Sequence, residues 1–272
     1  MKRISFFVLF LLTSLFLANR SFAQTQNLYK LPDLFKFDHQ VIQVLSAQKN
    51  GADVDTVYFF YNKSSDYAAV RMRRKAAMGG NLFIVLTRDG TSIVFDEHNK
   101  NITIVNIRKL ASELYGLSKW VRMDSLMANI RRKTDGKEFQ SSKTGNSRQV
   151  GGYTSEEYAV SDSRGHKGSV WCAKVDFGTP GDYILGATGA NFLNMMSSQL
   201  RAHPLLQALT QPMTLVTEID LKDSAGGKGI DLQTVSISPV STTVSTTGYT
   251  INNYSDMTMP EIFRAEMKKR NN

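Results

Sequence analysis

The residue types that carry out most chemistry in proteins are few in this sequence and lie far apart. The chain has 272 residues but only four histidines and one cysteine, Cys172. None of them stands at the spacing of a zinc site, and no His-Glu-x-x-His pattern is present. The histidines are His39, His98, His166 and His203. We therefore predict no metal centre and no cofactor.

Acidic side chains form two adjacent pairs, Asp96-Glu97 and Glu156-Glu157, in segments whose sequence is typical of strands. Neighbouring residues of a strand point to opposite faces, so neither pair forms a general acid/base pair by local geometry. The Gly-x-Ser-x-Gly turn of hydrolases is also absent. We predict that the protein is not an enzyme, and a catalytic site assembled from distant residues is the last of three functional hypotheses.

Two glycine-containing segments resemble phosphate-binding loops in part. Residues 182–190 contain two glycines, but Phe192 stands where a dinucleotide-binding turn has its third. In Gly226-Gly227-Lys228-Gly229 a glycine follows the lysine, where a phosphate loop has serine or threonine. We interpret the first segment as a loop that leads into a helix, and the second as a hairpin loop.

The only cysteine lies in the apolar run Val170-Trp171-Cys172-Ala173. A single cysteine cannot form an intramolecular disulfide, and a thiol in such a run is predicted to be buried and inert. Trp171 and Tyr153 lie in neighbouring strand-like segments, and strand aromatics usually pack across a sheet face. We expect both aromatic side chains to belong to the core.

The first 23 residues have the three-part pattern of a secretory signal peptide. Lys2 and Arg3 precede an apolar run at 4–18, and Ser21 and Ala23 fit the −3 and −1 positions of a cleavage site. The run is shorter than the ~20 residues of a membrane-spanning helix. We expect cleavage after Ala23, a single domain over residues 24–272 that is periplasmic or secreted, and no integral membrane segment.

The net charge is +9, and three of these positive charges lie in the leader, which leaves +6 on the mature chain. Basic residues cluster at 71–75, 131–133 and 268–270. The clusters lack the interleaved aromatics of a single-strand binding surface, and we interpret them as solvated faces and turns. Nucleic acid is therefore not expected as a partner, whereas weak attraction to anionic lipid headgroups stays open.

Strand patterns dominate the first half of the chain and are separated by short polar turns. They cover residues 57–61, 67–72, 81–87, 92–96 and 102–107, and Asp89-Gly90 marks a tight hairpin. Sequential strands with short connections predict an antiparallel meander, and not parallel strands with crossover helices.

Helical and strand patterns alternate in the rest of the chain. Apolar residues recur every three to five positions over 108–132, which predicts one or two helices, and the polar segment 134–148 is interpreted as a loop. Strands are expected at 153–161, 168–175, 213–221 and 230–240, and 241–254 is a final strand or a tail. Pro260 is expected at the first position of a short C-terminal helix.

A further helical pattern, at residues 191–209, is rich in methionine. Phe192, Met195, Met196 and Leu200 fall on one face of this helix. Two interpretations stay open: this face is part of the core, or it is a lid that forms the apolar wall of a ligand cavity. These four residues are the candidate ligand-binding residues.

Residues 143–175 resemble a family of exported bacterial domains of unknown function. The resemblance rests on the segments 143–145, 148–158 and 170–174, and residues 95–105 and Pro260 are similar to further elements of that family. Such domains resemble the lipoprotein-carrier fold of the LolA and LppX type. The resemblance implies an α+β fold in which a strongly curved antiparallel sheet, a half-barrel, is wrapped around or covered by a few helices.

The same resemblance implies no catalytic residue. Family members often have cysteine where Thr154 stands, and some are lipoproteins. This chain has neither feature, so no disulfide or lipid anchor is expected.

The leading functional hypothesis is a non-enzymatic periplasmic binding or carrier protein for an apolar ligand, a lipid or an acylated chain. The second is a structural or interaction module of the cell envelope with a filled core and no small ligand. A large cavity favours the first, a solid core the second, and converging titratable groups with shifted pKa values favour an enzyme. The expected partners are a lipid or a lipoprotein.

Overall fold

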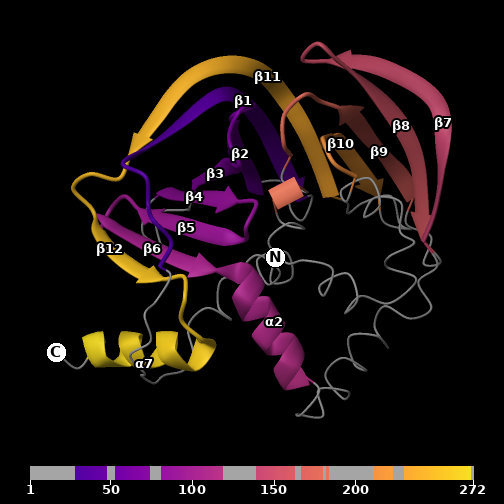
Figure 1. Ribbon diagram of the computed structural model, residues 1–272. Coiled ribbons are helices and arrows are strands. Elements are labelled where there is room, and N and C mark those ends of the chain that lie inside the picture. The colour runs from indigo at the N-terminus through magenta and orange to yellow at the C-terminus, as the bar shows by residue number, and fades with distance from the viewer. Residues whose placement is uncertain are drawn as a thin grey trace.

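The computed structural model describes residues 28–47, 53–73, 81–118, 139–162, 167–179, 182–183, 211–222 and 230–270. Figure 1 shows the strands and helices of these segments. The strands are β1 (Leu34–Ala47), β2 (Asp53–Tyr61), β3 (Tyr67–Arg73), β4 (Asn81–Thr87), β5 (Thr91–Asp96), β6 (Asn101–Asn106), β7 (Phe139–Val150), β8 (Tyr153–Asp162), β9 (Lys167–Lys174), β10 (Thr214–Lys222), β11 (Ile230–Ser245) and β12 (Thr250–Tyr254). The helices are α2 (Ile107–Ser118) and α7 (Met259–Arg270).

These strands form one 12-stranded sheet with the order β12-β6-β5-β4-β3-β2-β1-β11-β10-β9-β8-β7. Neighbouring strands pair antiparallel, except that β12 runs parallel to β6. Strands β3 to β6 form the predicted meander. The predicted turn at Asp89-Gly90 is confirmed, and Gly90 adopts a φ of 92° that favours glycine. The sheet is open, with β7 and β12 at its two edges.

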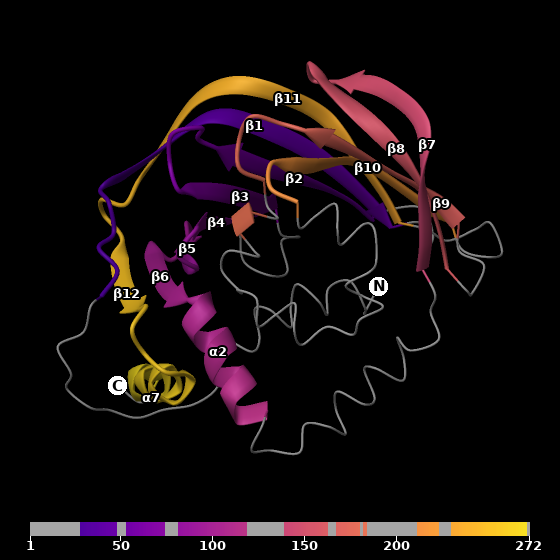
Figure 2. The same cartoon turned by 45° about the vertical axis from the view of Figure 1, so that its right-hand side comes forward.

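The sheet is strongly curved, and Figures 1 and 2 show it as an arch. Phe35 of β1 and Phe95 of β5 are four strand positions apart, which corresponds to about 19 Å in a flat sheet. Their ring centroids are nevertheless only 6.2 Å apart. Lys63, which follows β2, also pairs with Asp176, which follows β9. Contacts between strands so distant in the order require the sheet to curl.

A filled core, here called the aromatic cluster, joins one face of strands β2 to β6 to the first residues of β1. The alternation of strand side chains places Phe83 and Val85 of β4 on this face, together with Ile93 and Phe95 of β5. The Phe83 and Phe95 rings meet edge to face, with centroids 5.6 Å apart. The buried members are Phe35, Phe37, Phe60, Ala69, Phe83, Val85, Ile93, Phe95, Ile102 and Ile104. Burial of each large side chain stabilises the fold by about 1.5–3 kcal/mol.

Both helices pack at the β6–β12 edge. Leu110 of α2 and Ile262 of α7 share a small core with Val105 of β6 and Tyr254 of β12. The Glu261 carboxylate accepts hydrogen bonds from the Thr258 backbone N–H (2.7 Å) and hydroxyl (2.8 Å), which fixes the start of α7. In the part of the chain that the structure describes, the helices therefore lie at one edge, whereas the sequence predicts helices that cover the sheet. No described helix is both long and apolar enough to cross a bilayer.

Most predicted strands are confirmed, with three differences. The segment 134–148 is wrong as a loop, because residues from Phe139 onward form β7 and pair with β8. Strand β1 precedes the first predicted strand and pairs with both β2 and β11. The C-terminal helix begins at Met259, so Pro260 is its second residue. The strand interpretation of 241–254 is confirmed in part, since this segment completes β11 and adds the separate strand β12.

Candidate binding pocket

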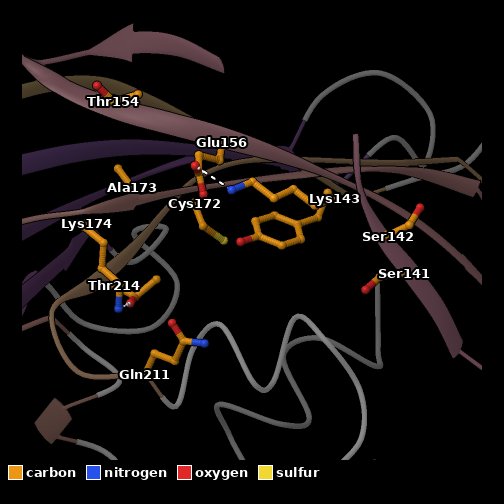
Figure 3. Close-up of a pocket in the computed structure, with 11 residues that line it drawn as sticks. Ser141, Ser142, Lys143, Thr154, Glu156, Cys172, Ala173, Lys174, Gln211 and Thr214 are labelled. Carbon is orange, nitrogen blue, oxygen red and sulfur yellow. Dashed lines mark hydrogen bonds and ion pairs between the residues drawn. The ribbon is translucent and has the colours of Figure 1, made fainter. Parts of the chain in front are cut away.

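A pocket of about 540 Å³ lies against strands β7 to β10, and Figure 3 shows its lining. Its size falls in the range of about 300–1,000 Å³ that is typical of small-molecule sites. The described lining residues are Ser141, Ser142, Lys143, Thr154, Glu156, Tyr158, Cys172, Ala173, Lys174, Gln211 and Thr214.

Strand alternation places these side chains. Thr154, Glu156 and Tyr158 are every second residue of β8 and therefore share one face. Glu156 stands opposite Cys172 of β9 in the antiparallel register, which brings the two side chains together. Glu157 points the other way, and its carboxylate accepts a hydrogen bond from the Asn146 side chain at 2.7 Å. Glu156 and Glu157 thus lie on opposite faces of β8, as strand alternation predicts.

One part of the pocket is charged. The Lys143 ammonium donates to the Glu156 carboxylate at 2.7 Å, and this hydrogen bond raises the pKa of Lys143 above its ordinary value. The Lys174 ammonium instead donates to two neutral oxygens, the Thr214 hydroxyl at 2.8 Å and the Pro212 carbonyl at 3.2 Å. Two cations and one carboxylate thus line the pocket among the described residues.

The other part of the pocket borders an apolar core. Val160 of β8, Val170 and Cys172 of β9, and Val216 of β10 form a buried cluster, and Tyr158 packs against it. Burial, with a smaller effect of the nearby Glu156 carboxylate, raises the pKa of the Cys172 thiol to about 12. The thiol is free and buried, which confirms the sequence prediction. Along β8 the lining residues are Thr154, Glu156 and Tyr158, and Tyr158 packs against the buried apolar cluster.

This arrangement can bind a ligand but offers no catalytic constellation among the residues described. A thiol with so high a pKa is a poor nucleophile at neutral pH. The Glu156 carboxylate is already paired with Lys143, so it is not a free base. No group of three or more His, Cys, Asp or Glu side chains in the described segments is placed to hold a metal ion.

The four predicted ligand-binding residues, Phe192, Met195, Met196 and Leu200, lie outside the described residues, and their role stays a prediction. The pocket lining was missed by the sequence reasoning, although its signal was partly visible. The alternation at 154, 156 and 158 lies in a predicted strand, but β7 was predicted as a loop and contributes three lining residues.

Neither of the two aromatic residues expected in the core, Trp171 and Tyr153, is fully buried. Trp171 is half-buried and belongs to none of the described core clusters, so its assignment to the core is wrong. It faces the same side as Glu157, and the Arg148 guanidinium covers its ring at 4.2 Å from the centroid. Tyr153 is also half-buried, meets the buried Phe177 ring edge-on and donates to Asp176 at 2.5 Å.

No family model matches the sequence, and no curated protein matches it. Solved structures are similar at low identity. A conserved protein from Thermus thermophilus is 7% identical, with a TM-score of 0.34 over 75% of this chain and 79% of that one. A putative outer membrane lipoprotein-sorting protein domain from Vibrio parahaemolyticus is 11% identical, with a TM-score of 0.27 over 75% and 85%. A LolA superfamily protein from Nitrosomonas europaea is 9% identical, with a TM-score of 0.25 over 76% and 87%.

The last two structures are named for lipoprotein sorting and for the LolA superfamily, the type that the resemblance at residues 143–175 indicated. The fold itself rests on the strand order and curvature of this chain's own sheet.

Proposed function

We propose that this protein is a non-enzymatic binding or carrier protein for a lipid or an acylated chain, which it holds in the pocket against β7 to β10. The observation that carries the proposal is the pocket of about 540 Å³ in which charged side chains line the same cavity as Tyr158, Cys172 and Ala173, next to a buried apolar cluster. A ligand that is polar at one end and apolar at the other matches such a lining.

The energetics favour an acylated ligand over a small polar one. Each methylene that leaves water contributes about 0.8 kcal/mol, so a chain of several methylenes against Tyr158 and its neighbours gains several kcal/mol. The polar lining residues then hold the end of the ligand that cannot be buried without hydrogen bonds.

The cellular setting that fits this function is the periplasm or the exterior of the cell. Lys2, Arg3 and the apolar run at 4–18 provide the export signal, and cleavage after Ala23 releases the mature chain. The proposed partners are a lipid or a lipoprotein. N-terminal sequencing of the exported protein is expected to begin at Gln24, and an intact leader would contradict this part of the proposal.

Native mass spectrometry of the protein, purified from its own cell envelope and then incubated with a phospholipid extract, tests the function. We expect a bound lipid that organic solvent removes. Ser141→Trp places a large side chain in the pocket, because Ser141 stands opposite Val160 and so shares the face of Glu156 and Tyr158, and it should abolish the adduct. Ser147→Trp is the control, because Ser147 is exposed on the same strand but does not line the pocket. Equal lipid binding by both variants would place the ligand elsewhere.

The aromatic cluster favours the second candidate, a structural or interaction module of the envelope. That part of the sheet is filled by its own side chains, with Phe35, Val85, Ile93 and Ile102 almost fully buried. Such a module needs no small ligand. A protein that remains free of lipid in the mass spectrometry experiment, while staying folded, would support this alternative.

A further inference from the structure

We infer that the pocket takes a ligand with a single negative charge, a carboxylate or a phosphodiester, and that Lys174 binds this charged end. The inference rests on the proposed function and adds the chemical class of the ligand's polar end. It follows from the unequal partners of the two lysines in the pocket.

Lys143 is neutralised within the protein. Its ammonium forms an ion pair with Glu156 at 2.7 Å, and both residues line the pocket. Lys174 pairs with no carboxylate among the described residues, and its two hydrogen bonds there go to the neutral oxygens of Thr214 and Pro212. An ammonium has three N–H donors, so one remains for a ligand. The described lining therefore carries one positive charge in excess.

The position of Lys174 matches the polar end of an amphiphile. Figure 3 shows Lys174, Thr214 and Gln211 at one end of the pocket and Ser141 and Ser142 at the other. Val170 is four residues before Lys174 on β9, which is about 13 Å along a strand. A chain that starts at Lys174 and follows β9 passes Cys172 and Tyr158, which line the pocket and lie against the buried apolar cluster that contains Val170 and Val160.

One excess positive charge distinguishes ligand classes. A monoanion neutralises the lining and forms a charge-assisted hydrogen bond with Lys174, which is stronger than a bond between neutral groups. An uncharged ester of the same chain keeps the apolar contacts but loses this bond. The negative charge of Glu156 repels any anion in the pocket and therefore weakens its binding.

Fluorescence titration with cis-parinaric acid and with its methyl ester tests the inference on the full mature chain. We expect the acid to bind about tenfold more tightly than the ester, which corresponds to about 1.4 kcal/mol. Lys174→Met should weaken binding of the acid about threefold to tenfold and leave the ester unchanged. Glu156→Gln should strengthen binding of the acid and leave the ester unchanged. Lys167→Met is the control, because Lys167 is exposed at the far end of the same strand.

The outcomes separate this inference from the proposed function. If acid and ester bind equally and no substitution separates them, the pocket binds chains but not their charged end, and the inference is wrong. If neither probe binds, the proposed function fails. Displacement of the acid by butyrate at equal concentration would indicate a small-anion site and overturn the inference. Displacement by lysophosphatidylglycerol as well as by palmitate would support the monoanionic class, and displacement by palmitate alone would restrict it to carboxylates.

Discussion

One half of the sheet is filled and the other half holds a pocket. On strands β1 to β6, phenylalanine, isoleucine and valine side chains meet in the aromatic cluster, and four of its five phenylalanines are no more than 2% exposed. Strands β7 to β10 instead contribute serine, threonine, lysine, glutamate, tyrosine, cysteine and alanine residues to the lining of a pocket of about 540 Å³. Both halves use the same antiparallel strand pairing.

The difference shows how one sheet can separate stability from binding. Interdigitated aromatic rings leave no room for a ligand, but their burial provides much of the folding free energy. Polar side chains of the other half contribute little to the core, yet they provide hydrogen-bond partners for a ligand. The two halves also contact each other beyond the ends of their strands. Lys63, which follows β2, forms an ion pair with Asp176, which follows β9, and the Tyr153 hydroxyl donates a hydrogen bond to the same carboxylate.

The largest effect is expected in the filled half. Phe83 is 1% exposed in the aromatic cluster. Phe83→Ala should lower the free energy of unfolding by about 3–5 kcal/mol, because it removes a buried ring and leaves a cavity. Urea denaturation measures the change. Tyr158→Ala, which removes a half-buried ring that lines the pocket, is the matched comparison and should cost less than about 2 kcal/mol. Equal losses of unfolding free energy in the two variants would show that the aromatic cluster stabilises the fold no more than the pocket lining does.

The second effect concerns the thiol of the pocket half. With a pKa raised to about 12 by burial, Cys172 holds about a thousandfold less thiolate at pH 8 than a thiol at the ordinary value. Alkylation by iodoacetamide should therefore be slower than that of the urea-unfolded protein by about that factor. Rapid alkylation of the folded protein would mean that the thiol is exposed to water.

The raised pKa also predicts a pH dependence with a definite sign. The folded state holds the proton of Cys172 more tightly than the unfolded state does, so this stabilising contribution is complete below the ordinary thiol pKa. It is lost as the pH rises from about 9 toward 12. Cys172→Ala should therefore reduce the loss of stability over this alkaline range. An unchanged alkaline profile would contradict the burial of the thiol.

A smaller effect is expected for Trp171, which lies on the pocket half but outside the core. Its ring is half-buried and is covered by the Arg148 guanidinium at 4.2 Å. Trp171→Ala should cost about 1–2 kcal/mol, because it removes a cation–π contact and partial burial. Arg148→Ala tests the same contact from the other side. A loss as large as that of Phe83→Ala in urea denaturation would place Trp171 in the core after all.

The smallest effect is expected at Asp176, which joins the two halves through its ion pair with Lys63. Hydrogen bonds from Lys63 and Tyr153 lower the pKa of Asp176, so its stabilising contribution is present above the ordinary carboxyl pKa and is lost as the pH falls below it. Because both charged groups are largely exposed, Asp176→Asn should cost less than about 1 kcal/mol at pH 7. The difference from wild type should vanish in acid. A difference that persists at pH 2 would exclude the carboxylate charge as its cause.

The sequence predicts the filled half better than the pocket half, and the reason is physical. The apolar residues of β4 to β6 alternate within short hairpins, so local periodicity identifies both the strands and their order. In β7, serine, threonine, lysine and asparagine occupy both faces, and the strand forms because β8 provides its hydrogen-bond partners. Such pairing is not encoded in local periodicity. This is why the loop interpretation of 134–148 failed.

Two further features depend on contacts that no local pattern carries. The buried residues of β1 alternate regularly, but the polar Gln43 is one of them, which obscures the apolar pattern of this strand in the sequence. The parallel pairing of β12 with β6 joins segments that are more than a hundred residues apart. The alternation at Thr154, Glu156 and Tyr158 is visible in the sequence, but its encounter with Lys174 and Gln211 depends on the register of other strands.

Photoaffinity mapping tests most directly whether only one half of the sheet accepts a ligand. A palmitic acid analogue with a diazirine on its chain is bound, cross-linked by light and located by peptide mass spectrometry. The pocket assignment predicts saturable labels on residues 141–143, 154–158 and 172–174, which excess palmitate prevents and Ser141→Trp abolishes. Saturable labels on strands β4 to β6 that survive Ser141→Trp would contradict the division of the sheet into a filled half and a binding half.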